Sequence, residues 1–126
     1  IDPIFSDASF NLAVTYQKLG LHRNAAAVLE DLMSRFPDNP GYLFALGHSL
    51  YHIGDLGGAR ETFSDVLSID PGHLKALFSL AVVCEKMGRE DEARRMWVEY
   101  LELDPKGEWA VEARSHLESL LRSDRR

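Results

Sequence analysis

Four prolines divide the chain at a constant interval: Pro3, Pro37, Pro71 and Pro105 each follow the previous one by 34 residues. A fixed period of this length is typical of a chain built from stacked copies of one small unit. Such a unit buries its apolar faces only by packing on its neighbours, so the repeat constrains the fold more strongly than any local motif. The main functional question is therefore which surface the stacked units present to a partner.

Three other features recur with the same period and divide each unit into two helices. They are a glycine after an apolar residue (Gly20, Gly54, Gly88), a small residue (Ala25, Ala59, Ala93) and a large apolar residue (Leu29, Phe63, Trp97). Apolar residues spaced three and four apart precede and follow each glycine, as in an amphipathic helix. A glycine just past a helix closes it in the left-handed conformation, and a small alanine lets two helices approach closely. Each unit is therefore expected to be a helix–turn–helix hairpin.

The period gives the chain three hairpins and shorter end segments. The expected hairpins are residues 6–39, 40–73 and 74–107. Residues 108–122 form one more amphipathic helix with a polar outer face, which is expected to cap the array, and a charged tail over 123–126 follows. Residues 1–5 repeat the Ile-Asp-Pro that closes the second unit, so we expect either the end of an upstream repeat or a simple lead-in. Asn39 and Asp55 are expected to be helix N-caps.

Charge and cysteine content argue against several classes of function. The formal net charge is −6, whereas a nucleic-acid surface needs clustered Lys and Arg to neutralise phosphates. No apolar run reaches the roughly 20 residues that cross a bilayer, so membrane insertion is not expected. The single cysteine, Cys84, rules out an intramolecular disulfide framework and a cysteine-based zinc site. A cytoplasmic location is expected, with a periplasmic one left open because sequence is expected to precede residue 1.

The recurring residues resemble those of the tetratricopeptide repeat (TPR) family, whose unit is a helical hairpin of the same length. The second unit matches best, through Leu43, Leu46, Gly47, Leu50, Ala59, Phe63, Val66 and Pro71. The resemblance covers nearly the whole chain. It implies an all-α fold, an α-solenoid with a right-handed superhelical path, made of three TPR hairpins and a C-terminal capping helix. It also implies a protein-binding module that is not an enzyme.

In this family the first helices of successive units line a concave groove that holds an extended or helical segment of a partner protein. Carried over position by position, the resemblance places ten residues in a peptide-binding groove here: Phe10, Val14, Phe44, His48, Tyr51, His52, Lys75, Phe78, Val82 and Lys86. Apolar and aromatic side chains would offer pockets to a ligand, and the lysines would meet its carboxylates. The alternative is that the phenylalanines fill space between the first helices, because packing recurs with the repeat as binding does.

One binding mode of the family is not expected here: the capture of Hsp70 or Hsp90 tails. That mode uses a clamp of lysines and asparagines on the first helices. Phe10, Val14 and Ala45 stand at three of the clamp positions. Lys75 matches the clamp, but Ser79 stands where a basic residue is expected.

Three interpretations of the function follow, and none of them needs a cofactor. The leading one is a scaffold or adaptor part of a larger protein, which captures a peptide segment of a partner. The second is a structural module that forms a homo-oligomer or packs on a neighbouring domain through the first helix. The third is a regulatory or carrier subunit of an enzyme. His48 and His52 have the spacing of a metal-binding pair, but no third ligand completes the set, so no metal is expected.

Overall fold

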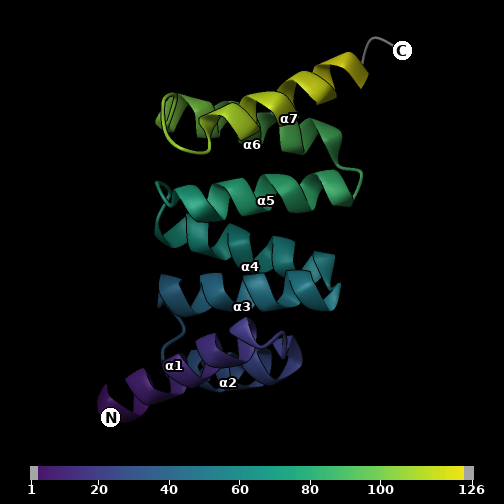
Figure 1. The fold of residues 1–126 in the computed structure, drawn as a ribbon. Helices are drawn as coiled ribbons and strands as arrows, with labels where there is room; N and C mark the ends of the chain where they lie inside the picture. Colours follow the sequence, from purple (N-terminus) through teal and green to yellow (C-terminus); the bar gives the residue numbers. More distant parts are fainter. Residues whose placement is uncertain (1–2, 124–126) are drawn as a thin grey trace.

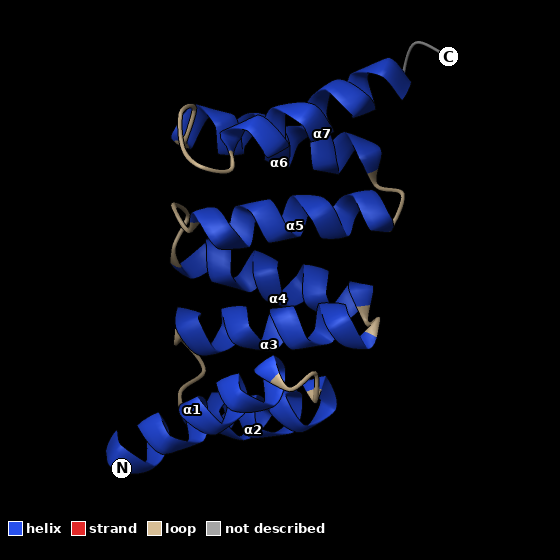
Figure 2. Cartoon of the chain, viewed as in Figure 1, coloured by secondary structure: helices blue, strands red, loops and turns tan. Residues whose placement is uncertain are grey.

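A computed structural model describes residues 3–123 (Figures 1 and 2). These residues form seven helices and no strand: α1 (Pro3–Lys18), α2 (His22–Arg35), α3 (Pro40–Ile53), α4 (Leu56–Ile69), α5 (Leu74–Lys86), α6 (Glu90–Leu103) and α7 (Ala110–Ser123). Each helix packs mainly on its neighbours in sequence, and α1 also contacts α3. The helices form a stack from α1 at one end to α7 at the other (Figure 1), which confirms the predicted α-solenoid. None of the helices within this range is long and apolar enough for a membrane span.

The helix boundaries differ from the expected unit boundaries at the two ends of the chain. The first helix already begins at Pro3, so residues 3–5 extend α1 instead of preceding it. Proline fits there because the first turn of a helix needs no amide hydrogen. At the other end, Trp109 lies in the turn before α7. Residues 1–2 and 124–126, which belong to the predicted lead-in and tail, lie outside the described residues.

The turns within the hairpins use glycine as predicted. Gly20, Gly54 and Gly88 have φ angles of 78°, 97° and 76°, in the left-handed region that glycine adopts without steric cost. Both predicted N-caps are confirmed. The Asn39 side chain accepts a hydrogen bond from the Tyr42 amide at 3.1 Å, and Asp55 accepts one from the Gly58 amide at 2.9 Å. The chemistry of the turns is therefore local and can be predicted from the sequence.

The core runs within the hairpins and between them, and it includes the recurring small and large positions. Ala25, Leu29, Ala59, Ala93 and Trp97 are 0% exposed, and Phe63 is 2% exposed. Gly47 on α3 approaches Phe63 on α4 so closely that a β-carbon at residue 47 would stand 2.6 Å from the ring. The repeated sequence pattern is thus a packing pattern, in which a small residue on one helix makes room for a large one on the other.

Helix α7 packs on α6 with one face and exposes the other. Ala110, Ala113 and Leu120 are buried, whereas Arg114, Ser115 and Glu118 are exposed, as expected for the outer face. Leu121 is 43% exposed although the adjacent Leu120 is 6% exposed, so only one leucine of this pair packs in the core. The role of α7 as the cap of the array remains a prediction, as does the division into repeat units.

Candidate functional site

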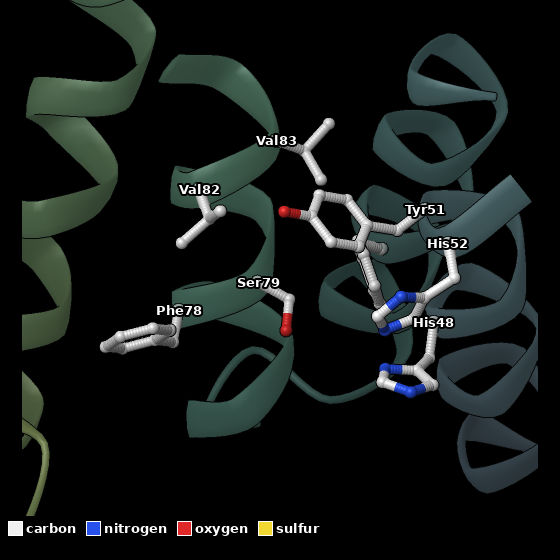
Figure 3. Close-up of a pocket in the computed structure, with 8 residues that line it drawn as sticks. His48, Tyr51, His52, Phe78, Ser79, Val82 and Val83 are labelled. Atoms are coloured by element: carbon white, nitrogen blue, oxygen red, sulfur yellow. The ribbon is translucent and has the colours of Figure 1, made fainter. Parts of the chain in front are cut away.

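Helices α3 and α5 form an apolar pocket that includes five of the predicted groove residues (Figure 3). The first pocket has a volume of about 160 Å³ and is lined by His48, Tyr51, His52, Phe63, Phe78, Ser79, Val82 and Val83. In Figure 3, Tyr51 and the two histidines lie on the α3 side, and Ser79 and Val82 lie on the α5 side. The first helices of the second and third hairpins thus supply most of its wall.

A second pocket adjoins the first, because Phe78 and Ser79 line both of them. The second pocket has a volume of about 140 Å³ and is lined by Phe44, Lys75, Phe78, Ser79, Trp109 and Glu112. The two pockets together include seven of the ten predicted groove residues. Sequence reasoning did not expect Phe63 and Val83 at the pocket. Both are core residues, at 2% and 1% exposure, and they line the first pocket.

The other three predicted groove residues, Phe10, Val14 and Lys86, line neither pocket. The ring of Phe10 packs on Tyr42 of α3 with 5.2 Å between the ring centroids. The Nζ atom of Lys86 lies 6.0 Å from the ring centroid of Tyr51, which brings its charge near the first pocket. Val14 is half-buried on α1. Contact of these three residues with a ligand remains a prediction.

The two phenylalanines that were expected to contact a ligand also hold helices together. Phe78 packs on the rings of Trp97, Tyr100, Trp109 and His116, at centroid distances of 4.9, 5.7, 5.4 and 6.4 Å. Phe44 packs on Phe63 and His73, at 5.6 and 5.1 Å. Both residues are half-buried and line a pocket. Each therefore has one side in the core and another toward the groove.

Glu85 of α5 is bonded to residues of the core. Its Oε2 atom accepts a hydrogen bond from Trp97 Nε1 at 2.8 Å and lies 2.8 Å from Nδ1 of His116. The His116 ring is stacked on Trp97, with 4.6 Å between centroids and 18° between planes. These three side chains come from α5, α6 and α7, so no local sequence pattern indicates that they meet.

A third histidine joins the predicted pair on α3. The ring of His22, from the first turn of α2, is stacked on His52 with 4.5 Å between centroids, and His48 is 4.5 Å from His52. Burial, followed by the neighbouring His52 and His22, lowers the pKa of His48, and burial followed by His22 lowers the pKa of His52. No group of three or more His, Cys, Asp or Glu within residues 3–123 is arranged to hold a metal ion.

Cys84 has the properties of a packing residue. Its side chain is 0% exposed and forms no disulfide. Burial is the main cause that raises the pKa of its thiol. A buried thiol with a raised pKa stays protonated and is a poor nucleophile, in agreement with the expectation from the sequence.

The family of the chain follows from comparison with known sequences. Two family models of the tetratricopeptide repeat match the chain, one over residues 10–73 and the other over residues 50–117. Each of these matches spans more than half of the chain, and they overlap in the second hairpin. The chain therefore belongs to the tetratricopeptide repeat family.

One known protein that is similar in sequence to the chain is much longer than the chain. The human Protein O-mannosyl-transferase TMTC3 is 31% identical over 106 residues, which cover 83% of this chain and 12% of that protein.

The solved structures that resemble the chain include complexes with a peptide. The Yersinia enterocolitica type III secretion chaperone SycD in complex with a peptide of the translocator YopD has a TM-score of 0.91 at 19% identity, covering 98% of this chain and 97% of SycD. The first TPR of Spaghetti (RPAP3), bound to the HSP90 peptide SRMEEVD, has a TM-score of 0.86 at 17% identity and full coverage of both chains. These structural likenesses concern the fold.

Proposed function

We propose that the chain is a protein-interaction module that holds an extended or helical segment of a partner protein along α3 and α5. The observation that carries this proposal is the pair of adjoining apolar pockets that share Phe78 and Ser79. Apolar pockets with a few polar groups at the rim are the usual form of a peptide site. The same fold holds a YopD peptide in SycD and an HSP90 peptide in Spaghetti, which supports the choice.

The two pockets suggest how a segment would bind. Two apolar side chains of the ligand would enter the pockets on either side of the shared wall at Phe78. Lys75 at the second pocket and Lys86 near Tyr51 would then meet carboxylates of the same segment. Two small pockets and two exposed cations are consistent with a transient contact, with a Kd on the order of 1–100 μM.

The proposal places the chain in a scaffold or adaptor rather than in an enzyme. The chain spans 12% of the length of its human relative, so we infer that it serves as the binding part of a larger protein. Two reactive side chains near the groove are committed to the fold, since Cys84 is buried and Glu85 is bonded to Trp97. The clamp positions for Hsp70 or Hsp90 tails carry Phe10, Val14 and Ala45, which favours a ligand of another kind.

Selection from a displayed library of random peptides tests this proposal. The wild-type chain is compared with Ser79→Tyr, because Ser79 lines both pockets and a ring at residue 79 would obstruct the groove between them without removing the side chain of Phe78. The matched control is Ala27→Tyr, which adds the same ring to the exposed surface of α2. We expect one consensus from the wild-type chain and the control, and none from Ser79→Tyr. A folded wild-type chain that enriches no consensus would overturn the proposal.

A second candidate function is self-association through α1. Phe5 and Leu12 lie on one face of α1 at 44% and 45% exposure, and Leu19 follows after another seven residues, in the turn just past the helix, at 67% exposure. The equivalent of Leu12 in the third hairpin, Leu80, is 4% exposed, because helix α4 covers it. The spacing of seven residues is that of a seam between two helices, so we propose a second copy of the chain as the occupant.

Sedimentation equilibrium tests the self-association. We expect a dimer at concentrations of about 10–100 μM, within the weak class of such interfaces. Leu12→Glu should restore the monomer, since it places a charge in the apolar seam. Leu121→Glu, at an equally exposed position on α7, is the matched control and should leave the dimer intact. A wild-type monomer throughout this range would exclude the second candidate.

A further inference from the structure

Three imidazole rings from two helices meet at the edge of the first pocket. His22 from α2 is stacked on His52 from α3, with 4.5 Å between centroids and 13° between planes. His48 lies 4.5 Å from His52 and 6.1 Å from His22, both in edge-on arrangements. His48 and His52 also line the pocket (Figure 3). Because His22 lies in the first turn of α2, the cluster connects the groove to the start of that helix. We call these three residues the histidine cluster.

The histidine cluster has no acidic partner among the described residues. The charges that act on His48 and His52 are those of the other histidines, and Nδ1 of His22 is buried without a hydrogen-bond partner. The nearby carboxylates are engaged elsewhere. Asp55 caps α4, and Glu85 is bonded to Trp97. A proton taken up by the cluster would therefore find no counter-charge within this part of the chain.

The other charged groups around the cluster are basic. Arg23 follows His22 on α2 and lines a hollow with His22 and His52. Lys86 of α5 stands over the ring of Tyr51, which lies next to His52 on α3. Neighbouring positive charges disfavour protonation of the imidazole rings. A bound anion would offset this repulsion, so a cluster of imidazoles among cations favours an anionic ligand.

The distribution of charge over the six helices of the hairpins also favours an acidic ligand. Helices α1, α3 and α5, which line the groove, carry three lysines and two carboxylates. Helices α2, α4 and α6 carry five arginines and nine carboxylates. The acidic net charge of the chain thus lies mainly on the outer helices, and the groove is left to receive an acidic segment.

We propose that the histidine cluster is the subsite for a carboxylate side chain of the bound segment, and that protonation of the cluster tightens this binding as the pH falls. The inference rests on the proposed function, since it assumes a segment in the groove. The geometry places the carboxylate next to the apolar side chain in the first pocket, because His48 and His52 belong to both sites. The histidine cluster thus supplies the pH-dependent share of the affinity.

Proton linkage gives the direction of the effect. Burial and the neighbouring histidines hold the pKa of His48 and of His52 below the usual value, so both rings are largely neutral at pH 7. A bound carboxylate stabilises the charged form and raises these pKa values, so binding takes up protons and is favoured by acid. The stability of the free chain depends on pH in the opposite direction, because protonation of these rings disfavours the folded state. Their contribution to stability is fully present above the ordinary histidine pKa and falls as the pH drops through the lowered pKa values of His48 and His52.

The test is a selection from a displayed random peptide library at pH 7.5 and at pH 5.5, with a metal chelator present. Circular dichroism at both pH values checks that each chain is folded. We expect an apolar consensus at both pH values and, at pH 5.5, an Asp or Glu at a fixed distance from one apolar position. The selected peptide should bind about tenfold more tightly at pH 5.5 than at 7.5, and its Asn or Gln counterpart should show no such gain.

Variants assign the effect to the histidine cluster. The double variant His48→Gln and His52→Gln should keep the apolar consensus and lose the acidic position together with the gain in affinity. The matched control is His73→Asn, which removes a histidine outside the cluster and keeps an N-cap on α5. A consensus without an acidic position would overturn this inference and leave the proposed function standing. An empty selection with a folded chain would overturn both.

Discussion

The indole Nε1–H of Trp97 donates a hydrogen bond to Oε2 of Glu85, at 2.8 Å, and so joins α6 to α5 beneath the groove. Trp97 is 0% exposed, and the indole N–H is a donor that must find an acceptor when it is buried. His116 of α7 reaches the same carboxylate oxygen. Glu85 therefore bonds to both α6 and α7.

Replacing Glu85 should destabilise the fold more than its partial exposure suggests. Glu85→Ala leaves the indole N–H of Trp97 buried without its acceptor, which costs about 1–3 kcal/mol. Urea unfolding followed by tryptophan fluorescence measures the change. Glu112→Ala is the matched control, because its carboxylate lies 3.9 Å from His116 and is 61% exposed. Equal losses in the two variants would mean that the bond to Trp97 contributes nothing of its own.

Gly47 should tolerate no side chain. A β-carbon at residue 47 would lie 2.6 Å from the ring of Phe63, which is 2% exposed and would have to shift. We therefore expect Gly47→Ala to destabilise the chain by about 1–3 kcal/mol, although alanine is the better helix former. Gly57→Ala is the control, since nothing lies within 4 Å of a β-carbon there. It should raise stability by up to about 1 kcal/mol, and thermal unfolding of both variants measures the contrast.

The parts of the structure that could be predicted from the sequence are those that depend on residues close together in the chain or on the period itself. Asn39 and Asp55 cap helices through amides three residues away, so their role follows from local chemistry. The contacts of Glu85 and His22 could not be predicted, because Glu85 joins α5 to both α6 and α7, and His22 joins helices from two hairpins. His73 also caps a helix, accepting from the Ala76 amide at 3.1 Å, although histidine is outside the usual set of N-caps.

The candidate site was predicted in outline for a related reason. The family resemblance indicated which helices face the groove, and seven of the ten expected residues line a pocket. The resemblance could not indicate how deep each side chain lies. The burial of each residue depends on the side chains that pack against it, such as Tyr42 against Phe10 or the four rings against Phe78.

The phenol of Tyr100 should make the free energy of unfolding fall as the pH becomes alkaline. Burial, followed by the hydrogen bond to Asp104, raises the pKa of Tyr100 to about 12. The unfolded chain loses this proton near the ordinary tyrosine value, so stability is fully present below about pH 10 and is lost as the pH rises toward 12. Urea unfolding at several pH values from 8 upward measures the slope. Tyr100→Phe should cost about 1 kcal/mol at pH 8 and flatten the alkaline loss. A slope that Tyr100→Phe leaves unchanged would assign the loss to other groups.

Phe78 should be more important for stability than for ligand contact. Its ring packs on Trp97, Tyr100, Trp109 and His116, so Phe78→Ala removes packing in the third hairpin and at α7 together. We expect a loss of about 2 kcal/mol, below the value for a fully buried phenylalanine because one face of the ring lines the groove. Val111→Ala, at a position 69% exposed on α7, is the control and should change stability by less than about 0.5 kcal/mol. Phe78→Leu separates the two roles, since leucine keeps much of the buried volume and loses the flat wall between the pockets. A variant Phe78→Ala that is as stable as the wild type and binds no peptide would reverse this assignment.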